Sequence, residues 1–180
     1  MSTIGFDTSN YTTSTAWTDG KTDINVRQIL YVKDGERGIR QSDGVFQHMK
    51  LMPVMYEKLS EQIDFKDVKA VGVSTRPRCV EGSYMPVFLA GEGYAKVVAN
   101  TLGVPLYEFS HQDGHIMAGI YSSGSFELLE NDFISVHLSG GTTEILKSRY
   151  NGFNFDNEIV GGSKDISAGQ FIDRVGVKMG

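Results

Sequence analysis

Hydrophobic and polar residues alternate along the first thirty positions of the chain. The alternating segments are residues 3–6, 12–17 and 24–32. Turn residues separate or follow them at Ser9 and Asn10, at Asp19 and Gly20, and at Lys33, Asp34 and Gly35. Because a two-residue period is typical of half-buried strands, the pattern predicts a meander of three antiparallel strands.

From residue 42 onward the hydrophobic period lengthens to three or four residues. The recurring positions are Val45, Met49, Met52, Met55, Tyr56 and Leu59. This spacing predicts a helix that runs to about residue 62, with Ser42 or Asp43 as its N-cap. Pro53 falls inside the helix and is expected to kink it or to begin a second one. We interpret His48, on the same helix, as a solvated or capping residue.

The middle of the chain alternates between short apolar runs and helical periods. A β-branched run at residues 68–74 predicts a buried strand, and a helix is expected over residues 86–102. A strand at residues 104–109 then leads into a helix over residues 111–121. Residues 122–131 include a glycine and several acidic side chains, and they form the predicted boundary between two lobes.

The pattern of the first lobe recurs after this boundary. Residues 133–138 and 143–148 predict a hairpin, and a further strand near residues 153–159 precedes a helix that begins at Asp165. Three strands followed by a helix thus occur over residues 3–62 and again over 133–180. We therefore predict an α/β fold with a first lobe over residues 1–127 and an incomplete second lobe over residues 131–180.

Composition narrows the class of protein. The 180 residues are 40% hydrophobic and 22% charged, which excludes a disordered or low-complexity chain. A net charge of −5 excludes attraction of nucleic acid by the overall charge of the chain. The single cysteine, Cys79, excludes an internal disulfide and favours a cytoplasmic location. Neither a secretory signal nor a membrane span is expected, since the longest uncharged apolar stretch is residues 85–91.

Two histidines lie four residues apart on the predicted helix over residues 111–121. His111 and His115 therefore share one helix face, which suits two ligands of one metal ion. Imidazole favours zinc or iron over magnesium or calcium. His137 is a candidate third ligand from the strand before Gly140. The alternative is that these are ordinary surface and strand histidines, because two ligands do not hold a metal alone.

Three turns carry hydroxyl, carboxylate and glycine residues that suit phosphate binding. The first follows the first strand and contains Asp7, Thr8 and Ser9. The second contains Ser139, Gly140, Gly141, Thr142 and Thr143, and the third contains Gly161, Gly162, Ser163, Lys164 and Asp165. Backbone N–H groups of such turns can surround an anion. Each turn is also compatible with plain hairpin chemistry, and Asp165 with a simple N-cap.

Taken in order, these motifs resemble the glycoprotease-like family that makes the threonylcarbamoyl adenosine modification of tRNA. The matching features are an Asp-Thr-Ser turn, a His-x-x-x-His helix, a Ser-Gly-Gly-x-Thr turn and a helix with the spacing Asp-x-x-x-Gly-x-x-x-Asp. In this chain the last of these is formed by Asp165, Gly169 and Asp173. The resemblance covers essentially the whole chain. It implies the actin-like, ribonuclease H-like ATPase fold, with a mixed five-stranded sheet in the first lobe.

The resemblance also implies roles for matched residues. His111, His115 and His137 would be metal ligands, with His137 at a position where some members have a tyrosine. The residues expected to bind an adenine nucleotide, either ATP or threonylcarbamoyl-adenylate, are Asp7, Ser9, Ser139, Gly140, Gly141, Thr142, Gly162, Asp165, Gly169 and Asp173. The implied reaction transfers threonylcarbamoyl from its adenylate to the adenosine beside the anticodon. The metal would act as a Lewis acid on the transferred group.

The chain departs from the family pattern in three places. The loop that reads Gly-Pro-Gly-Leu in the family reads Arg76, Pro77, Arg78 and Cys79 here, and the arginines could bind phosphate. A Gly-Glu pair reads Gly169-Gln170, which removes a carboxylate. The chain also ends at Gly180, before the further nucleotide-binding turns and the aspartate ligand of the family. These departures suggest a paralogue represented by a truncated chain.

Other functions remain open at this point. One is a non-catalytic module that forms a homodimer or a heterodimer with a protein of the same fold, through apolar residues on the helix over residues 86–102. Another is the metallopeptidase activity in the family's old name, although the glutamate of a His-Glu-x-x-His helix is missing. A sugar-kinase-like phosphotransferase would leave the histidine pair without a role. Contact with tRNA would be made through the full-length protein.

Overall fold

The computed structural model describes residues 1–33 and 38–179. The chain divides into two compact units, Met1–Gly114 and His115–Gly180. The predicted lobe boundary between residues 127 and 131 stays a prediction. Of the three predicted turns in the first meander, the one at Lys33, Asp34 and Gly35 lies largely outside the described residues.

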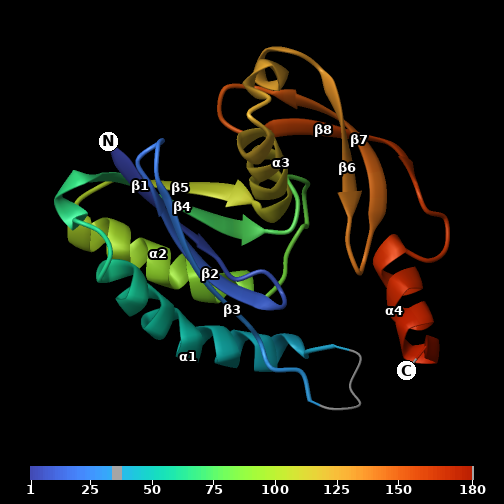
Figure 1. Ribbon diagram of the computed structural model, residues 1–180, viewed down its shortest axis with the longest axis horizontal. Helices are drawn as coiled ribbons and strands as arrows, with labels where there is room; N and C mark the ends of the chain where they lie inside the picture. Colours follow the sequence, from blue (N-terminus) through green and yellow to red (C-terminus); the bar gives the residue numbers. More distant parts are fainter. Residues whose placement is uncertain (34–37, 180) are drawn as a thin grey trace. The chain divides into compact units, whose positions relative to one another are not determined.

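A mixed five-stranded sheet forms the centre of the first unit (Figure 1). Its strands are β1 (Ser2–Asp7), β2 (Thr12–Thr18), β3 (Asp23–Ile29), β4 (Val68–Arg76) and β5 (Leu106–Ser110). The order across the sheet is β3-β2-β1-β4-β5. β1, β2 and β3 pair antiparallel, whereas β1, β4 and β5 run parallel to one another. This confirms the predicted meander and the predicted α/β fold with a ribonuclease H-like sheet.

Two long helices, α1 (Gln41–Ser60) and α2 (Phe88–Leu102), pack on one face of this sheet (Figure 1). Buried residues of β1 and β4 point into the layer between the sheet and the two helices. A short 3-10 helix, η1 (Phe65–Asp67), precedes β4. The core of this layer consists of Ile4, Phe6, Met52, Leu59, Val68, Val71, Val73, Ala95 and Ala99. The small residues of α2 allow it to approach the sheet closely, because they leave little side chain between helix and strands.

α1 departs from the sequence prediction at its start and at its proline. The helix begins at Gln41 with Arg40 at the N-cap position and no side-chain cap, so the predicted capping by Ser42 or Asp43 is wrong. Asp43 lies instead in the first turn, where a negative charge favours the helix dipole. Pro53 lies within one continuous helix and does not begin a second one.

His48 is fully buried, and the prediction that it is solvated was wrong. It lies on the face of α1 that also carries Met52, Met55 and Leu59, at helical spacing. Its Nδ1 atom lies 2.8 Å from the Thr13 hydroxyl of β2, and among the described residues its Nε2 atom has no hydrogen-bond partner. Burial lowers the pKa of His48 from 6.5 to about 4.

A three-stranded antiparallel sheet forms the second unit, with the order β6-β7-β8. Its strands are β6 (Phe133–Leu138), β7 (Thr143–Tyr150) and β8 (Phe155–Gly162). The helical segments are α3 (His111–Ser123), which begins in the first unit, η2 (Phe126–Glu130) and α4 (Ala168–Met179). The predicted repeat of three strands and a helix is therefore present. The last helix begins at Ala168 rather than at the predicted Asp165, because Ser167 supplies the cap: its hydroxyl accepts the Gln170 N–H at 3.2 Å.

Within the described part of the chain, every helix is too short or too polar to cross a bilayer.

The buried His48 predicts an acid-sensitive first unit. In the unfolded chain His48 binds a proton near pH 6.5, whereas in the native state it binds one only near pH 4. The free energy of unfolding should therefore fall by about 3 kcal/mol as the pH decreases from 7 to 4. Urea unfolding at several pH values, followed by Trp17 fluorescence, measures this change.

The control is His48→Gln, which keeps a polar group opposite Thr13 but does not titrate. It should flatten the dependence between pH 6.5 and pH 4. An equally steep decrease in the variant would show that other groups cause the acid sensitivity.

Candidate functional site

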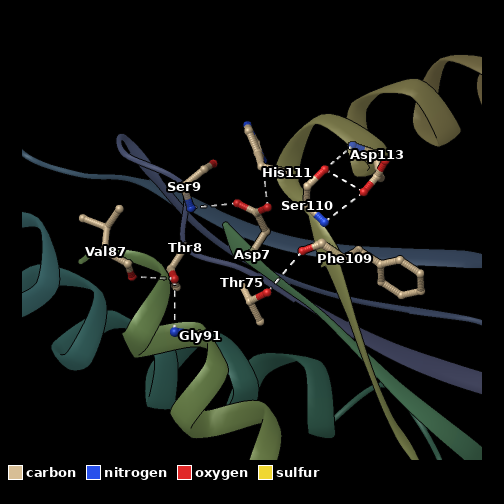
Figure 2. Close-up of polar contacts among 10 residues, drawn as sticks. All are labelled: Asp7, Thr8, Ser9, Thr75, Val87, Gly91, Phe109, Ser110, His111 and Asp113. Atoms are coloured by element: carbon tan, nitrogen blue, oxygen red, sulfur yellow. Dashed lines mark hydrogen bonds and ion pairs between the residues drawn. The ribbon is translucent and has the colours of Figure 1, made fainter. Parts of the chain in front are cut away.

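The carboxyl ends of the three parallel strands meet at one edge of the first sheet. Asp7 ends β1, Arg76 ends β4 and Ser110 ends β5, with Arg76 and Ser110 in register. In open α/β sheets, ligands bind outside this edge, because loops and helix N-termini converge there. Figure 2 shows the polar contacts of this region.

Asp7 is the centre of these contacts (Figure 2). One carboxylate oxygen accepts the Ser9 N–H at 2.8 Å, and the other lies 2.9 Å from His111 Nδ1. Burial alone would raise the pKa of Asp7, but the hydrogen bond and charge of His111, with hydrogen bonds from Ser74 and Ser9, lower it to about 2. Asp7 is therefore an ionised carboxylate at neutral pH and can only accept hydrogen bonds.

The ionised Asp7 fixes the orientation of His111. Because the carboxylate only accepts hydrogen bonds, His111 Nδ1 is the donor, and in the neutral form of the ring Nε2 is the nitrogen that carries the lone pair. The imidazole is half-buried, and its ring centroid lies 6.1 Å from that of Phe88. This is the arrangement in which metal-binding histidines occur, with a carboxylate behind the ligating ring.

The start of α3 is fixed by a reciprocal cap that the sequence analysis missed. The Ser110 hydroxyl accepts the Asp113 N–H at 3.1 Å, and the Asp113 carboxylate accepts the Ser110 N–H at 3.0 Å and its hydroxyl at 2.6 Å. Both side chains are buried. The signal was present, since a serine followed three residues later by an acidic residue marks a capping box. The cap holds His111 at the first position of the helix.

Thr8 anchors the other side of the site. Its hydroxyl donates to the Val87 carbonyl at 2.8 Å and accepts the Gly91 N–H at 3.0 Å, which ties the end of β1 to the start of α2 (Figure 2). A Cβ atom at Gly91 would lie 2.8 Å from the Thr8 hydroxyl, so glycine is required for this approach. The sequence predicted Thr8 within this turn but indicated no role for it.

In the second unit, two of the predicted metal ligands lie together. The ring centroids of His115 on α3 and His137 on β6 are 6.0 Å apart. In the described residues, however, no cluster of three or more histidine, cysteine or acidic side chains has the geometry of a metal site.

The turn between β6 and β7 is held by Ser139. Its hydroxyl accepts the N–H groups of Gly141 and Thr142 at 3.2 and 2.9 Å, and its own N–H donates to the Thr142 carbonyl at 2.8 Å. The turn is thus pre-formed by its own side chain, with Gly140 and Gly141 exposed at its tip.

The start of α4 packs directly against this turn. The Gly169 N–H donates to the Ser139 carbonyl at 3.3 Å, and the Ser167 hydroxyl donates to the Gly140 carbonyl at 2.7 Å. A Cβ atom at Gly169 would lie 2.7 Å from both the Ser139 carbonyl oxygen and the Gly140 Cα. Three predicted nucleotide-binding positions therefore come together because residue 169 has no side chain.

The remaining predicted nucleotide residues are less closely engaged. Gly162 ends β8, where a Cβ atom would lie 2.8 Å from the Thr143 carbonyl oxygen. Asp165 lies in the exposed segment before α4, and Asp173 lies exposed on α4 itself. The predicted site residues thus form two groups. Asp7, Ser9 and His111 lie in the first unit, and the others lie in the second.

The contact between α4 and the turn predicts an asymmetric response of two glycines. Gly169→Ala should separate the start of α4 from the turn and destabilise the second unit by roughly 1–3 kcal/mol. Gly176→Ala, at a position on α4 with nothing near its Cβ, should instead stabilise the helix by about 0.5–1 kcal/mol. Amide hydrogen exchange of residues 139–143 and 168–171 measures both effects. Equal protection in the two variants would contradict the packing described here.

Comparison with protein families gives a match over residues 36–180 to the model of tRNA N6-adenosine threonylcarbamoyltransferase (TsaD). A relative with this name from Christiangramia forsetii is 31% identical over 126 residues, which are 69% of this chain and 34% of the relative. Another from Pyrobaculum calidifontis is 27% identical over 180 residues, which are 98% of this chain and 49% of the relative. The chain thus spans between a third and a half of the length of these relatives.

Solved structures share the fold. YeaZ from Pseudomonas aeruginosa matches with a TM-score of 0.51 at 11% identity, over 91% of this chain and 66% of that chain. A second protein described as similar to the peptidase YeaZ, from the same organism, matches with a TM-score of 0.52 at 10% identity. The match covers 87% of this chain and 63% of that chain. The family match covers most of the chain, including the histidine pair and the glycine-rich turns. This chain therefore belongs to the tRNA N6-adenosine threonylcarbamoyltransferase family.

Proposed function

We propose that this chain contributes the first lobe, and the beginning of the second, to an enzyme that transfers threonylcarbamoyl from its adenylate to a tRNA adenosine. The observation that supports the proposal best is the Asp7–His111 pair at the carboxyl ends of the parallel strands. Membership in the family supplies the reaction class. Because the chain spans at most half of its relatives, turnover would require the remaining lobe, from the same protein or a partner.

The chemistry of the proposed donors, three imidazole rings, suits a divalent zinc or iron ion. His111 and His115 follow one another by one turn of α3, and the ring of His137 contacts that of His115. The carboxylate of Asp7 accepts from His111 Nδ1, so that Nε2 would be the nitrogen available to a metal ion. Imidazole ligands favour zinc and iron over the harder magnesium and calcium ions. When bound, the metal would supply Lewis-acid polarisation of the transferred carbonyl group.

The nucleotide part of the proposal rests on the second unit. The Ser139 turn and the start of α4 bring hydroxyl groups and close-packed glycine backbone together, which lets a phosphate approach the main chain. Gly162, Asp165 and Asp173 are proposed to lie beside the sugar of an adenine nucleotide. In this arrangement the residues of the chain bind and orient the donor, while Asp7 keeps His111 in one tautomer.

Zinc titration of the 180-residue chain tests the metal proposal without any need for activity. Calorimetry should detect one Zn²⁺ per chain. His115→Ala and His137→Ala should each weaken binding by about 10-fold or more, since each removes one imidazole ligand.

The matched control is His48→Gln, which alters the one histidine not proposed as a ligand. It should bind Zn²⁺ as the unmodified chain does. Absence of binding, or equal affinity in all three variants, would contradict a histidine metal site.

A second candidate function is a module that pairs with a protein of the same fold. The observation that favours it is a set of exposed apolar side chains on the two helices that cover the sheet. On α1 these are Phe46, Met49 and Val54, and on α2 they are Leu89 and Val97. Scattered surface hydrophobes are ordinary, whereas several on adjacent helices support an interaction surface.

This candidate predicts self-association through α2. Sedimentation velocity at high protein concentration should show a dimer, and Leu89→Glu with Val97→Glu should shift it to monomer, because buried unpaired carboxylates oppose association. Thr101→Glu, at an exposed polar position of the same helix, is the control and should leave the dimer intact. A monomeric unmodified chain would leave only pairing with a different protein.

A further inference from the structure

Arg76 is a half-buried cation at the edge of the sheet where the proposed site lies. It ends β4 and is in register with Ser110, the residue before His111. Its guanidinium donates to the Thr75 hydroxyl at 3.1 Å and contacts the Cys79 sulfur at 3.7 Å. Neither acceptor is a carboxylate. Across residues 1–33 and 38–179, no ion pair involves Arg76.

The loop that carries Arg76 is held in place by backbone contacts. The Pro77 carbonyl accepts the Gln112 N–H at 3.0 Å, which ties the loop to the first turn of α3. The Arg78 N–H donates to the Ser83 hydroxyl at 2.9 Å. Arg76 and Arg78 flank Pro77, and both arginines are half-buried. The two hydrogen bonds fix the loop at its contact with α3 and at Ser83.

Among the described residues, no carboxylate forms an ion pair with Arg76. Asp7, at the end of the neighbouring strand β1, directs its two oxygens to the Ser9 N–H and to His111 Nδ1. Glu81, the acidic residue of the same loop, is exposed to solvent. A partly buried cation without a carboxylate costs free energy, and a bound oxyanion removes that cost.

We propose that Arg76, supported by Arg78, binds the phosphate of a nucleotide at the carboxyl end of β4. Guanidinium suits this role because its planar fork of N–H donors matches the spacing of phosphate oxygens. The choice of a nucleotide rests on the proposed function, whereas the phosphate contact itself does not. An RNA backbone is a weaker candidate, because the chain has a net charge of −5 and binding of a polyanion requires many cations.

The experiment uses the 180-residue chain and observes the arginine side chains directly. NMR spectra of the ¹⁵N-labelled chain report the Nε–H groups during titration with adenosine 5′-monophosphate, inorganic phosphate or adenosine. The monophosphate and phosphate should shift the Arg76 signal, and adenosine should not. Arg76→Gln should weaken monophosphate binding by about 10-fold or more, as loss of a charge-assisted hydrogen bond predicts. Arg76→Lys should weaken it less.

Arg27→Gln is the matched control, because Arg27 lies exposed on β3 and should bind nothing. A fourth titration uses a six-nucleotide RNA without a terminal phosphate. Stronger Arg76-dependent binding of this RNA than of the monophosphate would overturn the choice of a nucleotide. Equal monophosphate affinity in Arg76→Gln and the unmodified chain, or no binding at all, would overturn the site itself. Either result leaves the zinc titration of the proposed function unchanged, so the two failures are distinguishable.

Discussion

The contact between the Asp7 carboxylate and the His111 imidazole is the constraint around which the first unit is arranged. The two residues are 104 positions apart, and they meet because β1 and β5 flank β4 as parallel strands. The lowered pKa of Asp7 corresponds to about 2 kcal/mol of interaction that favours its charged form. Asp7 is ionised above pH 4, and the stabilisation that depends on its charge is lost as the pH falls towards 2.

The contacts around this pair explain how the end of β1 holds the histidine in one orientation. Thr8, next to Asp7, is hydrogen-bonded to Val87, just before α2, and to Gly91 within that helix. Ser110, next to His111, closes a reciprocal cap with Asp113. Each member of the pair therefore has a buried neighbour that fixes its backbone. The proposed role of His111 as a metal ligand would require this support, because small displacements of a ligand reduce metal affinity strongly.

The sequence predicted the elements well, because the periods of its hydrophobic residues are clear in both lobes. It failed where the neighbours of a residue decide its environment. His48 has the polarity of a surface residue, but its spacing with Met52, Met55 and Leu59 places it inside the protein. Asp165 has the character of an N-cap, yet Ser167 fills that position because its hydroxyl also reaches the Gly140 carbonyl. The preference of a single residue type for a cap or for the surface does not include such tertiary contacts.

The prediction of the site residues followed a different logic from that of the fold. The motifs predicted Asp7, His111 and Gly169 as site residues without indicating their contacts. The structure shows a hydrogen bond between the first two and a close backbone approach at the third. For Arg76, in contrast, the structure indicates a role that no motif predicted. This residue belongs to none of the matched motifs, and in the part of the chain that the structure describes its guanidinium donates to a hydroxyl and to a sulfur atom. A half-buried cation that pairs with no carboxylate among the described residues is explained most simply by a ligand that carries negative charge.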